Sequence, residues 1–168
     1  MQFSPEQRNL VVHAANEAEE RTARYYCIPP FRWNQLSYDL LTREDTGWEP
    51  LPEPVLARVQ LLQKIGPEPH KPFDFYRIQL NDPSILTVAT REKLEGNLYH
   101  FLVFILTHEM VHMVRLSSIL EPDKAIPQIL ETEEQRVQRI SRQILSGGNF
   151  QAFHPIGEKF CITHLNSD

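Results

Sequence analysis

The sequence contains few cysteines and no long apolar run. Only two of its 168 residues are cysteines, Cys27 and Cys161, and they lie far apart in the chain. This excludes a disulfide framework and a cysteine-based zinc site, and it fits a reducing compartment. The longest apolar run, residues 101–106, is too short to span a bilayer. The first residues show no export signal, so we expect a cytoplasmic protein.

The sequence also lacks an excess of positive charge. Lysine and arginine together number 17 against 22 aspartates and glutamates, so the formal net charge is −5. The basic residues form no stripe that could follow a phosphate backbone or bind an anionic lipid surface. We therefore expect neither a nucleic-acid partner nor a membrane partner.

Glycine is scarce and proline is abundant, with 6 and 13 residues respectively. Prolines at helix starts and in connectors predict stiff joints between the elements. With 41% hydrophobic residues, the chain has enough apolar side chains to form a core without disulfides. We expect a single domain over residues 1–168, composed of a helical part over about 1–66, a hairpin with two further helices over about 73–146, and a C-terminal tail over 147–168.

The first part of the chain carries helix signals. Ser4-Pro5-Glu6-Gln7 matches a capping box with proline at the first helical position, and it predicts a helix to about residue 25. Apolar residues at helical spacing predict a shorter helix over about 33–41. The same kind of pattern predicts a third, amphipathic helix over 55–65.

A change of pattern follows in the middle of the chain. Residues 67–72 contain three prolines and predict a stiff connector. Runs rich in β-branched and aromatic residues at 75–80 and 85–90 flank a turn sequence at 81–84, which predicts a β-hairpin.

Two helices are predicted after the hairpin. Apolar residues around the whole circumference from about 91 to 116 predict a long buried helix, and a last helix is predicted over about 127–145. A short strand is predicted at 160–163. The pattern favours an α+β fold that is mostly helical, with a small antiparallel sheet or hairpin packed on the buried helix.

The buried helix contains His108-Glu109-Met110-Val111-His112, which matches the pattern H-E-x-x-H. Residues four positions apart lie about 40° apart around a helix, so both histidines can bind one metal ion. Glu109 lies about 100° from His108, where a base acting on a metal-polarised water would stand. Two imidazoles, a carboxylate and an open fourth position are typical of a hydrolytic zinc site, so we expect one Zn²⁺ ion.

A third protein ligand must come from another element. The extended pattern with a third histidine is absent, because Arg115 and Ser118 occupy the positions of its glycine and histidine. The next helix offers Glu131, Glu133 and Glu134. In steps of about 100° per residue, the apolar face of this helix includes Glu134, has Glu133 at its border and leaves Glu131 outside. We favour Glu134 as the ligand, with Glu133 and Glu131 as alternatives, and Arg115 can pair with either of these two.

This arrangement resembles the gluzincin type of zinc metallopeptidase, in which a glutamate on the next helix follows the H-E-x-x-H motif. The helix from Glu134 to Leu145 is similar to the E-x-x-A-x-x-F-A-x-x-L-L helix of small bacterial and phage metallopeptidases that cleave repressor proteins, with Val137 and Ile140 replacing its first alanine and its aromatic residue. The resemblance covers residues 101–145 and implies a zincin-like fold. It implies zinc ligands at His108, His112 and Glu134, and a general base at Glu109.

Three further expectations follow, and only the first two rest on the resemblance. Glu131 fits the longer spacing of aminopeptidase-like gluzincins. The strand predicted at 85–90 is the candidate sheet edge for binding an extended peptide. His154 and His164, in the tail, are candidates for bonding the oxyanion or for filling the open metal position.

The predicted function is hydrolysis of peptide bonds in a peptide or protein substrate, through a zinc-activated water with Glu109 as general base. The alternative is a non-catalytic, metal-stabilised regulatory or interaction domain, in which a tail residue such as His154 or Glu158 closes the site. A third possibility is an interaction module without metal, in which the motif is accidental.

Overall fold

The computed structural model describes residues 1–64, 73–117, 119 and 131–159. Over these residues the protein has an α+β, mostly helical fold, with six α-helices and a three-stranded sheet. The elements follow in the order α1 (Pro5–Tyr25), α2 (Pro30–Trp33), β1 (Ser37–Leu41), β2 (Ala57–Lys64), β3 (Phe73–Leu80), α3 (Asp82–Arg91), α4 (Leu98–Leu116), α5 (Glu133–Ile144) and α6 (His154–Lys159), with short 3₁₀ turns at Glu95–Asn97 and Gln151–Phe153.

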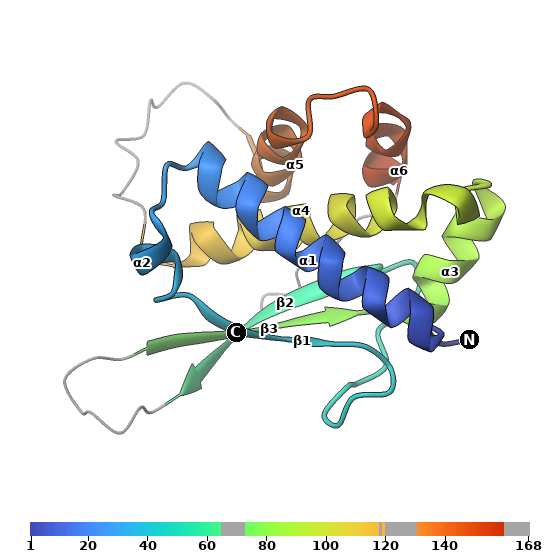
Figure 1. The fold of residues 1–168 in the computed structure, drawn as a ribbon, viewed down its shortest axis with the longest axis horizontal. Coiled ribbons are helices and arrows are strands. Elements are labelled where there is room, and N and C mark those ends of the chain that lie inside the picture. Colours follow the sequence, from blue (N-terminus) through green and yellow to red (C-terminus); the bar gives the residue numbers. More distant parts are fainter. Residues whose placement is uncertain (65–72, 118, 120–130, 160–168) are drawn as a thin grey trace.

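Helix α4 lies at the centre of the fold. The sheet lies on one side of α1 and α4, and α5 and α6 lie on the other side (Figure 1). α4 packs against α1, α5 and β2, and every residue from Phe101 to Val114 is buried. The long buried helix is therefore confirmed, although it begins at Leu98 because α3 ends at Arg91 and a short turn follows. Among the described helices, none combines the length and the apolar character that crossing a membrane requires.

The sheet has β3 as its central strand and is mixed, so the prediction of a small antiparallel sheet is correct only for one of its two strand pairs. β1 pairs with β3 in parallel, and β2 pairs with β3 in an antiparallel arrangement. Ile78 at the middle of β3 lies between Leu40 of β1 and Val59 of β2. Tyr76, Ile78 and Leu80 are fully buried and face the helices. The antiparallel hairpin therefore consists of β2 and β3, and the order β1-β3-β2 makes β2 an edge strand among the described residues.

The prediction of a helix over 55–65 is wrong, because these residues include strand β2. Ala57 and Val59 are buried while Arg58 and Gln60 between them are partly exposed. This period of two matches a half-buried strand, and pairing with β3 satisfies the backbone. The predicted N-terminal helical part over 1–66 thus contains two strands. The helix predicted over 33–41 is also wrong beyond Trp33, because Ser37–Leu41 forms β1 beside β3.

The prediction of a strand over 85–90 is wrong, and with it the candidate sheet edge in that segment. The turn sequence at 81–84 is the start of helix α3, with a proline in its first turn. Ile85, Val88 and Ala89 are buried at helical spacing. Asp82 is also buried, and its carboxylate accepts hydrogen bonds from the backbone amides of Phe3 (3.0 Å) and Arg43 (3.2 Å).

The first and last predicted helices are confirmed where the structure describes them. α1 begins after Ser4, and Ser4 and Gln7 form the predicted capping box. α5 lies within the predicted range, but residues 131 and 132 precede the helix, so it begins later than predicted. The predicted connector at 67–72, the start of the last helix at 127–130 and the strand at 160–163 lie outside the described residues.

Two leucines on α4 test this packing with the same substitution. Leu106 is fully buried, whereas 54% of Leu116 is exposed. Leu106→Ala leaves a cavity and is expected to lower the free energy of unfolding by about 2–5 kcal/mol. Leu116→Ala is expected to change it by less than about 0.5 kcal/mol. Urea-induced unfolding followed by circular dichroism measures both values, and equal losses would contradict the packing of α4.

Candidate metal centre

Two histidines on successive turns of α4 face the same point. His108 and His112 are 2% and 4% exposed, and their Nε2 atoms lie 3.2 Å apart. Both lie in the most apolar helix of the chain, where an imidazole without a polar partner is costly. The partner for both rings comes from α5.

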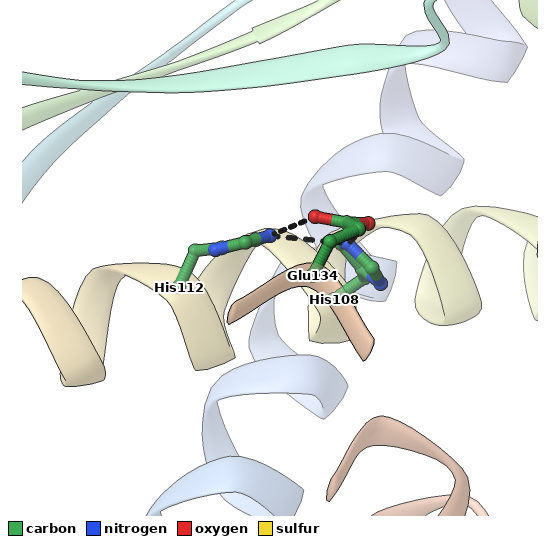
Figure 2. Close-up of side chains that lie close together, drawn as sticks. All are labelled: His108, His112 and Glu134. Carbon is green, nitrogen blue, oxygen red and sulfur yellow. Dashed lines mark hydrogen bonds and ion pairs between the residues drawn. The ribbon is translucent and has the colours of Figure 1, made fainter. Parts of the chain in front are cut away.

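Glu134 is the carboxylate that meets both histidines. It lies in the first turn of α5, whose start is fixed by a capping box between Thr132 and Gln135. Its Oε1 lies 3.0 Å from Nε2 of His108, and its Oε2 lies 3.1 Å from Nε2 of His112. Figure 2 shows the three side chains converging from the two helices. About a quarter of the Glu134 side chain (24%) is exposed, so the cluster reaches solvent on the α5 side.

The donor set fits a single metal ion. A tetrahedral ion with bonds of about 2.0–2.1 Å holds its ligand atoms about 3.3–3.4 Å apart. The shortest separations in the cluster, 3.0, 3.1 and 3.2 Å, lie within a few tenths of an ångström of that value. His108, His112 and Glu134 each offer one ligand atom, all within 4.8 Å of one another. Two imidazole nitrogens and one carboxylate match the hydrolytic type of zinc site.

The other two candidate glutamates point elsewhere. Glu133 binds Arg115 of α4 through two contacts of 2.6 and 3.2 Å. This is one of the two pairings expected for Arg115. Glu131 binds Arg139 at 2.9 and 3.2 Å and lies 3.5 Å from Arg136. The structure therefore brings only Glu134, of the three, to the histidines. This is the glutamate that the apolar face of the helix favoured.

The pKa shifts of His112 and Glu134 favour the protonation states that metal binding requires. Burial lowers the pKa of His112, and its interaction with His108 lowers it further, while Glu134 opposes both effects. Burial raises the pKa of Glu134, but its contacts with His108 and His112 outweigh this and bring it to about 2. At neutral pH the cluster thus contains a neutral His112 ring and an ionised carboxylate, which are the ligand forms of both groups.

Glu109 lies beside the cluster and is completely buried. Neither of its carboxylate oxygens makes a hydrogen bond of ordinary geometry among the described residues, and the backbone of Val59 lies beside them. Burial raises the pKa of Glu109 well above its ordinary value, and the negative charge of Glu134 raises it further. The backbone of Val59 on β2 acts in the opposite direction, but it offsets only part of this rise in the pKa of Glu109. Such a carboxyl group favours a proton in the absence of a neighbouring cation.

Of the two candidate histidines of the tail, only His154 is described, and it is not among the grouped ligands. His154, at the start of α6, lies edge-on to Phe104, with the ring centroids 6.1 Å apart. Phe104 is one turn before His108 on α4. His164 and the side chain of Glu158 lie outside the described structure.

Strand β2 borders the site, which the predicted helix over 55–65 did not anticipate. β2 packs against α4, it passes beside the three side chains in Figure 2, and the backbone of Val59 reaches Glu109. The alternation of apolar and polar residues from Ala57 to Leu61 was the available signal.

The pH dependence of stability tests the environment of Glu109. In metal-free protein the folded state keeps a proton on Glu109 that the unfolded chain releases above its ordinary pKa of 4.5. The free energy of unfolding therefore falls as the pH rises above about 4.5 toward the folded pKa. Glu109→Gln removes this loss, so the variant is expected to melt at a higher temperature than wild type at pH 8. The difference should shrink toward pH 5.

The measurement is thermal unfolding of both proteins in a chelator at pH 5 and pH 8. The pH dependence of Glu134 is common to both proteins, so the difference between them isolates Glu109. A difference that is the same at both pH values would contradict a buried, protonated Glu109.

Comparisons with known proteins find no match to this chain. This holds for protein-family models, for curated proteins and for solved structures. A function for this protein must therefore be argued from the cluster of His108, His112 and Glu134 and from the buried Glu109 beside it.

Proposed function

We propose that the protein is a zinc metallopeptidase with a zincin-like fold, which hydrolyses peptide bonds in a peptide or protein substrate. In this proposal His108, His112 and Glu134 hold one Zn²⁺ ion and Glu109 is the general base. The observation that carries the proposal is the convergence of two imidazoles from α4 and one carboxylate from α5. The two Nε2 atoms lie 3.2 Å apart, and the two carboxylate oxygens lie 3.0 Å and 3.1 Å from one Nε2 atom each.

Each residue has a defined part in the reaction. A bound zinc ion supplies a Lewis acid that polarises water and the substrate carbonyl. Glu109 accepts a proton from the attacking water and delivers it to the nitrogen of the leaving amine as the C–N bond breaks. Burial of Glu109 supports this part, because it raises the proton affinity of a carboxylate that would otherwise be a weak base at neutral pH.

The edge of β2 is the proposed position of the substrate backbone. Among the described residues β2 pairs with β3 on one side only, and it passes beside the cluster in Figure 2. An extended peptide can add to such an edge through main-chain hydrogen bonds. Because the backbone of Val59 lies next to Glu109, a peptide on this edge would lie close to the general base. β2 thus takes the part that the sequence pattern had suggested for residues 85–90.

A non-catalytic, metal-stabilised domain is the second candidate. The observation that favours it is that none of the Glu109 side chain is accessible to solvent, whereas a general base must contact water. In this candidate the same three residues hold a metal ion that links α4 to α5. The two candidates share the metal site and differ in the role of Glu109.

We also propose a cytoplasmic location, without a nucleic-acid or membrane partner. Cys27 is an exposed free thiol, which supports a reducing compartment. The net charge of −5 argues against binding to phosphate-rich surfaces.

Zinc binding tests the ligand assignment, with two glutamates of the same segment as a matched pair. Wild-type protein is expected to bind one Zn²⁺ ion in a competition titration. Glu134→Gln removes a ligand, so the affinity of the variant for zinc should fall by more than roughly 10–100-fold, the loss typical of mutating groups that hydrogen-bond to metal ligands. Glu131→Gln should keep the wild-type affinity, because Glu131 lies just before α5 and binds arginines of that helix. Equal affinities for wild type and Glu134→Gln would contradict the assignment.

Hydrolysis of an unstructured protein such as casein tests the role of Glu109. The zinc-loaded wild type is expected to cleave it, and Glu109→Gln should retain zinc while its rate falls by about 10²–10⁴-fold, the usual contribution of a general base. Mass spectrometry of the products and elemental analysis measure the two quantities. A Glu109→Gln variant as active as wild type would exclude the proposed mechanism, and a zinc-loaded wild type without activity would favour the non-catalytic candidate.

A further inference from the structure

An ion pair joins α4 to the first turn of α5 immediately beside the proposed metal site. Arg115 lies three residues after His112, and Glu133 directly precedes Glu134. The guanidinium contacts both carboxylate oxygens, with Nε 2.6 Å from Oε1 and Nη2 3.2 Å from Oε2. A two-point contact of this kind fixes the relative direction of the two groups as well as their distance.

The arginine in this pair is held on its own side. Only 16% of the Arg115 side chain is exposed, and the hydroxyl of Tyr26, at the C-terminal end of α1, lies beside the guanidinium. Packing against α4 and α1 limits the positions that the guanidinium can take. The Arg115 guanidinium is therefore held in place on α4, and its ion pair with Glu133 links the first turn of α5 to α4.

The apolar contacts of α5 with the motif segment of α4 are few. Val137 and Ile140 pack against Val111 in a small cluster, and only at the other end of α5 does Ile144 also contact the main core. Contacts of this size allow small rotations of a helix about its axis, because apolar packing is not directional. A rotation of α5 would move Glu134 away from both imidazoles, and a contact that resists it must lie in the same turn as Glu134.

We propose that Arg115 is a positioning residue, which holds Glu133 and thereby keeps Glu134 turned toward His108 and His112. The inference rests on the proposed metal site and adds a residue that does not itself touch the ion. Its consequence is that loss of Arg115 weakens metal binding although every ligand is still present.

The sign of the effect distinguishes positioning from simple electrostatics. Arg115 is a positive charge near the proposed cation site, and its neighbour Glu133 is negative. If only charge mattered, Arg115→Gln would remove a repulsion and leave Glu133 unneutralised, so zinc would bind more tightly. If Arg115 positions Glu134, the same variant binds zinc more weakly, by about 10–100-fold as for other groups that orient ligands.

The test is a Zn²⁺ competition titration of the full chain, together with the visible absorption spectrum of the Co²⁺-loaded protein, which reports the ligand set. Arg139→Gln is the matched control, since Arg139 also forms a two-point contact, with Glu131, and neither residue is among the three that group as ligands. The double variant Arg115→Glu/Glu133→Arg restores an ion pair with the charges exchanged. Circular dichroism of the metal-free proteins checks that each variant is folded.

The expected result is weaker zinc binding and an altered Co²⁺ spectrum for Arg115→Gln, with both close to wild type for Arg139→Gln and largely restored in the double variant. Unchanged or tighter binding by Arg115→Gln would overturn the positioning role and leave the metal site intact. If Arg115→Gln does not fold, the double variant decides, since a folded double variant with weak binding and an altered spectrum would overturn the role. A wild type that binds no zinc would overturn the proposed function and this inference together.

Discussion

The arrangement of the protein depends on the cost of burying polar groups in α4. This helix packs against α1, α5 and β2, and His108, Glu109 and His112 lie in its buried part. Each of these side chains loses contact with water, and each therefore needs a polar partner or an ion. Glu134 meets both imidazoles, whereas Glu109 makes no hydrogen bond of ordinary geometry among the described residues and the nearby backbone of Val59 offsets its burial only in part. A cation beside Glu109 would offset its burial.

The need of the buried polar groups of α4 for partners also explains the position of α5. Its apolar contact with Val111 is small, and its surface is rich in charged residues. One of its glutamates reaches the histidines, one binds Arg115 of α4, and Glu131, just before the helix, binds arginines within α5. Three nearby acids thus have three different partners. These pairings together set the geometry of the candidate site, so the loss of one of them is expected to shift the residues of the others.

Local signals in the sequence were enough for the helices that carry the candidate site. Three signals can be recognised within a few residues of the chain: the capping box at Ser4, the apolar circumference of α4, and the spacing of His108 and His112. The face of α5 indicated Glu134 for the same reason. The sheet could not be predicted in this way. β1 and β2 form because each pairs with β3, and Asp82 begins a helix where the turn sequence resembled a hairpin. These outcomes depend on partners far away in the chain.

The central claim is that α4 and α5 together hold one zinc ion through two imidazoles and one carboxylate. X-ray absorption at the zinc edge of the purified, zinc-loaded protein tests it most directly, because it identifies the atoms bound to the ion. The account predicts only nitrogen and oxygen neighbours at about 2.0–2.2 Å, with the outer-shell signature of two imidazole rings. Sulfur neighbours at about 2.3 Å, or the absence of imidazole signals, would contradict it.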